Sequence, residues 1–232
     1  MKERPIIFNS EMVRAILEGR KMQTRRVINP QPTIKPRIFK NEDGVFWSLI
    51  DKCLFQKSPF GTIGDKLWVR ETWRVGAWDE NKGTIAIDYK DNDNVFARRE
   101  WLEVEDDEMF NKLWIQSTID AHKAGIKSDK QGQYHWKVGE APTRWRSSIH
   151  MPRWASRIGL ENIDIRVERL KDITEEDARD EGVEHPDIAT SPPSTYSDYK
   201  HKFKLLWDSI NAKRGCGWDI NPWVWAIEFK KL

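Results

Sequence analysis

The densest group of polar side chains in the sequence is the run GRKMQTRR at residues 19–26. Lys21 and Thr24 stand three positions apart, which can bring an amine and a hydroxyl into one pocket when the segment is extended or irregular. A lysine with a depressed pKa beside a hydroxyl can serve as a base and nucleophile pair. On chemistry alone, a basic loop that binds phosphates or lies in solvent is the simpler interpretation.

Other familiar sites are missing from the sequence. It has no P-loop, no G-x-G-x-x-G and no G-x-S-x-G motif. The five histidines lack metal-ligand spacing, and Cys53 and Cys216 stand far apart. We therefore expect no metal site, no cofactor and no disulfide framework, with reduced thiols as in a cytoplasmic protein.

Composition and charge indicate a globular chain with an uneven charge distribution. A third of the 232 residues are charged and 38% are hydrophobic, and no apolar run approaches the length of a membrane span. The sequence also begins without a signal-peptide pattern. Residues 1–40 hold ten basic and three acidic side chains, whereas residues 88–109 hold three basic and nine acidic ones. A positive cleft for a phosphate-bearing partner is one interpretation, and a mixed, solvated surface is the other.

Short strands and short helices are expected around the polar run. The periodicity predicts a helix over 11–18 that ends at Gly19, and a compact helix within 173–182 that Thr174 caps. Further helices are predicted at 108–124 and 197–212, strands at 5–8, 61–75, 84–89, 162–170 and 221–232, and loops at 27–36, 125–140 and 185–197. Without regular βαβ alternation, this order predicts a mixed α+β domain built on a small sheet or barrel. Residues 76–147 look like an insertion or lid.

Four separated motifs resemble one known family. The signature G-x-K-x-x-[E/T]-x-R is present in residues 19–26, GDKLWV at 64–69, DITEEDARDEG at 172–182 and WAIEFKKL at 225–232. Together they resemble the ASCH superfamily, whose PUA-like fold is associated with RNA. HMPRWASRI at 150–158 and LWDSIN at 206–211 are similar to the longer ASCH proteins of phages and prophages. The resemblance implies a single domain over 1–232, with a small β-barrel, flanking short helices and a lid-like insertion at about 76–147.

One subgroup of this superfamily is closer in its motif. The small bacterial N4-acetylcytidine amidohydrolases also carry Thr at the sixth signature position, and their catalytic set is a Lys, a Thr and a Glu. The resemblance maps this set onto Lys21, Thr24 and Glu181, with Glu175 and Glu176 as competitors for the last position. It implies that Thr24 is the nucleophile or positions the attacking water, that Lys21 is the base or polarises the acyl oxygen, and that Glu181 holds Lys21 or moves the proton. The chain departs from this subgroup in its greater length and in its tryptophan-rich, charged insertion.

The resemblance implies a nucleoside or nucleic-acid partner, with RNA preferred to DNA. Such a partner requires side chains that bind its phosphates and stack on its bases. The expected binding residues are three arginines of the polar run and three tryptophans beside matched motifs: Arg20, Arg25, Arg26, Trp68, Trp73 and Trp154. Arg26 braces the site or contacts a phosphate or carbonyl. For each tryptophan, packing in the core is the alternative interpretation.

The sequence leaves several functions open. The first is hydrolysis of an acyl group from a modified cytosine. The second is a non-catalytic RNA- or DNA-binding module that reads a modified or unpaired base, and the third is a ribonuclease, for which no histidine pair or metal set is visible. An accessory phage protein that acts through a protein partner is a fourth.

Overall fold

The computed structural model describes residues 2–32, 37–41, 44–49, 52–90, 100–184 and 199–232, with only the backbone described for 37–56. The chain divides into two compact units. The first comprises residues 1–6, 12–68 and 158–232, and the second comprises 7–11 and 69–157. The predicted insertion at 76–147 falls within the second unit, while its role as a lid and the single domain over 1–232 stay predictions.

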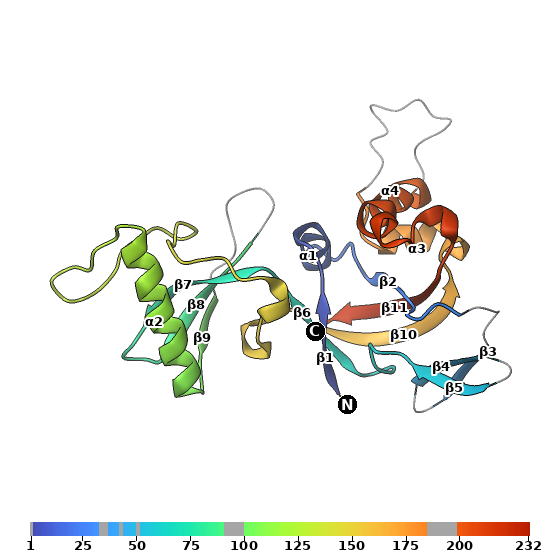
Figure 1. The fold of residues 1–232 in the computed structure, drawn as a ribbon, viewed down its shortest axis with the longest axis horizontal. Coiled ribbons are helices and arrows are strands. Elements are labelled where there is room, and N and C mark those ends of the chain that lie inside the picture. Colours follow the sequence, from blue (N-terminus) through green and yellow to red (C-terminus); the bar gives the residue numbers. More distant parts are fainter. Residues whose placement is uncertain (1, 33–36, 42–43, 50–51, 91–99, 185–198) are drawn as a thin grey trace, which may run out of the picture. The chain divides into compact units, whose positions relative to one another are not determined.

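The first unit contains a five-stranded sheet in the order β1-β6-β10-β11-β2. Its strands are β1 (Glu3–Ile7), β2 (Gln23–Val27), β6 (Lys66–Arg70), β10 (Gly159–Arg169) and β11 (Trp223–Lys231). The long antiparallel pair β10 and β11 forms the middle, and β2 pairs with β11 so that Thr24 lies opposite Ile227 (Figure 1). The mixed α+β class is confirmed. Among the described residues no strand pairing closes the sheet, so the expected small barrel is not found there.

Short helices complete the first unit, and their ends follow the sequence signals. They are α1 (Ser10–Leu17), α3 (Glu175–Asp180), α4 (Tyr199–Asn211) and the 3-10 turns η3 (Leu170–Asp172), η4 (Ala212–Arg214) and η5 (Trp218–Ile220). Thr174 caps α3 in a capping box, in which the Asp177 amide donates to its hydroxyl at 3.0 Å. Figure 1 shows α3 and α4 over the β10–β11 pair, where Phe203, Trp207 and Val224 share one buried cluster.

A bulge in β10 changes which side chains that strand buries. Alternation predicts that Ile163, Ile165 and Val167 face the core together. The register with β11 shifts between Asn162 and Asp164, and Ile163 is 43% exposed while Ile165 and Val167 are buried. An extra residue in one strand reverses the alternation from that point, so Asn162 takes the buried position in place of Ile163.

Several strands were not expected from the sequence. β2 itself lies inside the polar run, and the expected strand at 61–75 divides into β6 and the start of β7 (Trp73–Asp79). A separate three-stranded sheet of the first unit contains β3 (Arg37–Asn41), β4 (Gly44–Leu49) and β5 (Lys52–Lys57). The expected loop at 27–36 is described only as far as residue 32, and the one at 185–197 lies outside the described residues.

The second unit is a three-stranded antiparallel sheet with one long helix. It contains β7 (Trp73–Asp79), β8 (Thr84–Tyr89), β9 (Glu100–Glu103), α2 (Asp107–Lys123), η1 (Ser148–His150) and η2 (Arg153–Ala155). Its core gathers side chains from β7, β8 and α2, among them Trp73, Ile87, Tyr89 and Phe110. The helix predicted at 108–124 is therefore confirmed, and it begins after the N-cap Asp106.

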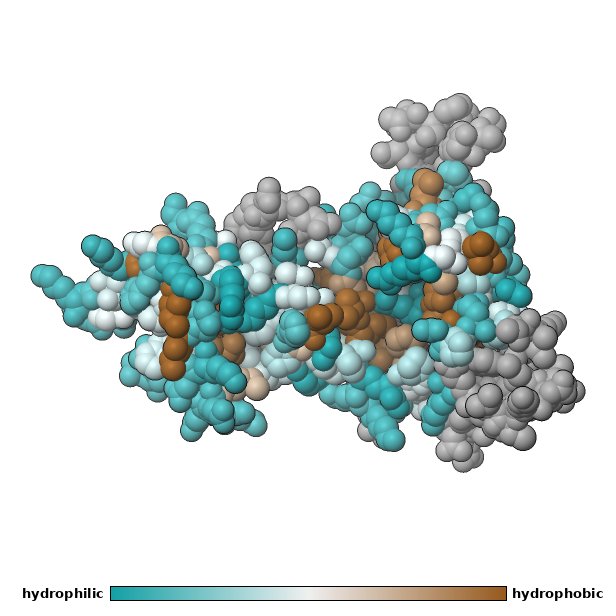
Figure 2. Space-filling model, in the orientation of Figure 1, coloured by the Kyte–Doolittle hydropathy of each residue, from teal (hydrophilic) through white to brown (hydrophobic). Residues whose placement is uncertain are grey.

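The surface is largely polar on the face drawn in Figure 2, where hydrophobic side chains gather in a few places. In the described part of the chain, no helix combines the length and the apolar character that a membrane crossing requires.

Gly182, which follows α3, provides a test of the packing in the first unit. Its φ is +83°, and a Cβ built on it would lie 2.6 Å from the Lys21 Cβ and 2.9 Å from the Ala15 Cβ. Gly182→Ala therefore combines backbone strain with a steric clash, and we expect it to lower the free energy of unfolding by about 3 kcal/mol in urea titrations. Gly19→Ala is the matched control, since Gly19 has a φ of +76° but no atom within 4 Å of such a Cβ. Its expected loss is about 1 kcal/mol, and equal losses would contradict the steric explanation.

Candidate functional site

A buried ion pair joins Lys21 to Glu181 in the first unit. The Lys21 ammonium lies 2.8 Å from Oε2 of Glu181 and donates to the Glu181 carbonyl oxygen at 2.7 Å. The Lys21 side chain has no exposed surface, and that of Glu181 has 3%. The backbones also meet, because the Met22 amide donates to the Asp180 carbonyl at 2.8 Å and Lys21 and Glu181 form an isolated β-bridge.

Arg25 binds the second carboxylate oxygen of Glu181. Its guanidinium lies 3.2 Å from Oε1, and it also contacts Glu168 at 2.7 Å and Asp177 at 3.0 Å. Gln23 donates to Asp177 at 2.8 Å. Lys21, Gln23 and Arg25 alternate along the chain, so their side chains leave it on one side and all reach carboxylates in or beside α3. Each buried charge thus faces an opposite charge, as burial of charge requires.

Burial lowers the pKa of Lys21 below its ordinary value of 10.5. The charge of Glu181 and its hydrogen bond act in the opposite direction, while the charges of Arg26 and Arg25 add to the lowering. Burial also lowers the pKa of Arg26, with Glu181 acting against it and Arg214 adding to it. Deprotonation of Lys21 to the neutral amine therefore costs less free energy than deprotonation of an exposed lysine, and a general base must be in this neutral form.

A pocket of about 290 Å³ lies beside this pair. Its walls come from α1, β2, the loop at residue 60, the residue after α3, α4 and η4. They comprise Met12, Thr24, Arg25, Arg26, Val27, Phe60, Glu181, Phe203, Leu206, Trp207, Ile210, Asn211 and Arg214. Small-molecule sites measure roughly 300–1,000 Å³, so this pocket lies at the small end of that range. The mixture of apolar walls with Arg26, Arg214 and Glu181 suits a ligand that has a flat apolar part and polar substituents.

The structure brings the expected catalytic set together around Glu181. Lys21 contacts Glu181 directly, and Thr24 lines the same pocket as Glu181, whereas Lys21 itself lies outside the pocket lining. Of the competing carboxylates, Glu175 is exposed and accepts from the Lys200 amide at 3.3 Å, and Glu176 is exposed as well. Glu181 is therefore the one of the three that contacts Lys21.

The three expected arginines take different places. Arg20 donates to Glu18 at 2.7 Å and to the Gly182 carbonyl at 3.0 Å, so it joins α1 to the segment after α3. Arg25 belongs to the buried network. Arg25 and Arg26 both line the pocket, but the Arg25 side chain has no exposed surface, so Arg26 is the one of the two that a ligand group can reach.

The three expected tryptophans lie outside the pocket lining. Trp68 is buried in β6, opposite Gly159 of β10. Trp73 and Trp154 meet edge to face in the core of the second unit, with ring centroids 6.1 Å apart. These two side chains pack in the core of the second unit. A base-stacking role for the three tryptophans stays a prediction.

Other site residues were missed by the sequence analysis. Asp177 of α3 binds both Arg25 and Gln23. Leu206 and Ile210 of α4 line the pocket. The polar alternation at positions 21, 23 and 25 is the signal that predicts a strand facing carboxylates.

Within the described segments, no group of three or more His, Cys, Asp or Glu side chains could hold a metal ion. No family model matches the sequence, and comparison with curated proteins and with solved structures gives no match either. The ASCH resemblance therefore stays a prediction that rests on the four motifs.

Asp177 allows a test of the network at acid pH. Its burial raises its pKa, but the hydrogen bond from Gln23 and the charge of Arg25 outweigh this effect, so the pKa of Asp177 lies below its ordinary value of 3.8. A lowered folded pKa stabilises the protein above the unfolded pKa, and this contribution is lost as the pH falls through the folded pKa. Asp177→Asn should cost about 2 kcal/mol at pH 7, and its difference from wild type should shrink as the pH falls below 3.8.

Urea titrations at several pH values measure this difference. The control is Asp219→Asn, because that side chain is 88% exposed and lies 3.7 Å from Lys171. It should change stability by less than about 1 kcal/mol throughout. A pH-independent difference between wild type and Asp177→Asn would contradict the assignment.

Proposed function

We propose that this protein is an amidohydrolase that removes the acyl group from N4-acylated cytosine, as a nucleoside or within nucleic acid. The observation that carries the proposal is the 2.8 Å contact of Lys21 with Glu181, beside a pocket that Thr24 and Glu181 line together. The proposal also includes an ASCH-type, PUA-like fold for the first unit and a cytoplasmic location. Where the substrate is a polymer, we propose RNA in preference to DNA. Support for these comes from the sequence motifs.

The reaction breaks the amide bond between the acyl carbon and N4. Thr24 adds its hydroxyl oxygen to the acyl carbon, or positions the water that does so, and the proton passes toward the neutral amine of Lys21. N4 leaves as an amine after it takes up a proton, and water supplies the hydroxyl of the released carboxylic acid. Glu181 holds Lys21 and stabilises the ammonium that forms, in the way that an orienting carboxylate assists a base.

The pocket supports a nucleoside of this kind. Phe60 is half-buried and can offer a ring face to the pyrimidine, whereas Phe203 and Trp207 are buried within the pocket wall. Arg26 and Arg214 line the same pocket, and cationic side chains there can polarise an acyl oxygen or bind a phosphate. The proposal therefore assigns base stacking in this pocket to Phe60, since none of the three expected tryptophans lines it.

A second candidate function is binding of a modified base without turnover. The observation that favours it is the complete burial of the Lys21 side chain, which has no exposed atom for a substrate to meet. A buried ion pair can also serve only to fix a conformation. Hydrolysis requires the proton to move through Thr24 and Glu181, which do line the pocket.

Mass spectrometry of N4-acetylcytidine and related N4-acylcytidines, free and in oligonucleotides, tests the hydrolase. We expect the wild-type protein to turn over at least one of them. Thr24→Val, Glu181→Gln and Lys21→Met should each lower kcat/KM by about 10²-fold or more. Thr24→Val is the decisive variant, because it removes the hydroxyl and leaves the Lys21–Glu181 contact in place.

Controls separate catalysis from folding. Lys230→Met removes a lysine whose side chain is 56% exposed and which lies 3.2 Å from Glu161, so turnover should stay at the wild-type level. Circular dichroism melting establishes that each variant is folded. Absence of turnover by the wild-type protein, or full activity of Thr24→Val, would contradict the hydrolase. Salt-dependent binding without turnover would support the second candidate.

A further inference from the structure

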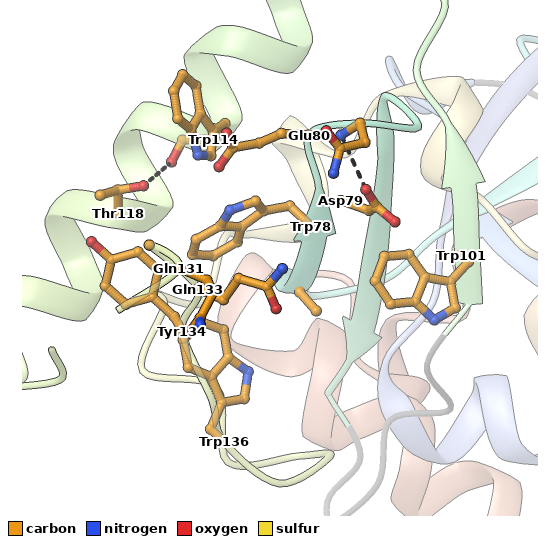
Figure 3. A pocket seen from close by; sticks show the side chains of 13 residues that line it. Trp78, Asp79, Glu80, Trp101, Trp114, Thr118, Gln131, Gln133, Tyr134 and Trp136 are labelled. Atoms are coloured by element: carbon orange, nitrogen blue, oxygen red, sulfur yellow. Dashed lines mark hydrogen bonds between the residues drawn. The ribbon is translucent and has the colours of Figure 1, made fainter. Parts of the chain in front are cut away.

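The second unit holds a pocket of about 580 Å³ that the proposed hydrolase does not use. Its walls come from the end of β7, the β7–β8 turn, β9, α2 and the loop at 131–136 (Figure 3). Five aromatic rings line it, those of Trp78, Trp101, Trp114, Tyr134 and Trp136. Such a volume is ordinary for a site that binds a small molecule.

Three of the rings form one tilted cluster. The Trp78 ring lies 5.7 Å from that of Tyr134 and 5.5 Å from that of Trp136, at interplanar angles of 52° and 56°. Tyr134 and Trp136 are themselves tilted by 40°. In Figure 3, Trp101 stands across the pocket from this cluster, and it is 53% exposed. Because these three rings are tilted, no two of them are parallel, so a flat base cannot stack between them. Each ring can still contact a ligand with one of its faces.

The polar groups of the pocket are amides and carboxylates. In the described part of the chain, the side-chain amides of Asn81, Gln131 and Gln133 have no hydrogen-bond partner in the protein, and each provides both donors and an acceptor. Asp79 accepts from the backbone amides of Asn81 and Lys82 at 3.1 and 3.3 Å, and Glu80 adds a second carboxylate. Among its described lining residues, no lysine, arginine or histidine provides a positive charge for a phosphate.

Hydrogen bonds fix the loop that carries half of these groups. Trp136 donates its indole N–H to the Gly76 carbonyl at 2.6 Å, and Tyr134 pairs with His122 at 2.7 Å. The backbone amides of Gln131 and Gln133 donate to Asp129 at 2.9 and 2.8 Å. The side chains of Tyr134 and Trp136 and the backbone that carries Gln131 and Gln133 are therefore held in place before a ligand arrives, which reduces the entropy lost on binding.

We propose that this pocket binds a neutral carbohydrate. A pyranose ring has an apolar C–H face that packs on one indole, and its hydroxyls both donate and accept hydrogen bonds, which matches free amides beside carboxylates. A nucleotide would find no cation for its phosphate among the described residues that line the pocket. A methylated ammonium would use the rings and carboxylates but leave the amides of Gln131 and Gln133 without a role.

Two experiments test this site. An array of neutral oligosaccharides first selects the sugars that bind the protein. NMR titrations then use the selected disaccharides together with maltose, cellobiose and diacetylchitobiose. We expect saturable shifts of the indole N–H signals of Trp78, Trp101 and Trp136 in the intact chain. Trp101→Ala and Gln133→Ala should each weaken binding by about tenfold. Both positions are exposed, so these variants should keep the wild-type fold.

Trp145→Ala is the matched control, because Trp145 is a 39% exposed tryptophan of the same unit that does not line the pocket. It should bind sugar as the wild-type protein does. Titration of choline and of cytidine against the same signals separates the other ligand classes. No saturable sugar binding, sugar binding that Trp101→Ala leaves unchanged, or a preference for choline or cytidine at these signals would overturn the proposal.

Discussion

Two charged side chains from segments 160 residues apart, those of Lys21 and Glu181, meet out of contact with solvent. Removal of such charges from water costs several kcal/mol for each ion, and only close contact with further hydrogen bonds offsets that cost. The helix end at Gly19, strand β2 and the turn at Gly182 must therefore hold fixed positions, because a small displacement would leave a buried charge unpaired. Gly182 meets this requirement by its lack of a side chain, since Lys21 and Ala15 occupy the space that a Cβ would take.

The same contact determines what chemistry the first unit can perform. Burial lowers the pKa of Lys21 and the charge of Glu181 counters it, so a proton can move at moderate free-energy cost in this pair, of which Glu181 lines the pocket. Arg25 binds the other oxygen of Glu181 and keeps its carboxylate oriented toward the lysine. Thr24 lies between Gln23 and Arg25 in β2 and lines the pocket together with Glu181. The proposed hydrolysis uses these neighbours and requires no group that the chain itself lacks.

Local signals in the sequence predict much of this fold, while contacts between distant segments are beyond them. Gly19 and Thr174 predict where helices end and begin because a positive φ and a side-chain cap are local properties. Ile163 was assigned to the wrong face, since a bulge depends on the partner strand. The association of Lys21 with Glu181 came from the family resemblance, and no spacing rule predicts it. The sequence contains 13 tryptophans, but only the tertiary structure separates core rings such as Trp73 from pocket rings such as Trp101.

The most direct measurement is an NMR pH titration of Lys21 in protein labelled with ¹³C at the lysine Cε, with its signal assigned by Lys21→Met. We expect Lys21 to titrate below its ordinary value of 10.5, because burial is the dominant influence on its pKa. In Glu181→Gln the pKa should fall further, since the charge that raises it is removed. A Lys21 signal that titrates with the exposed lysines, and is unchanged by Glu181→Gln, would contradict the buried pair on which the proposed chemistry depends.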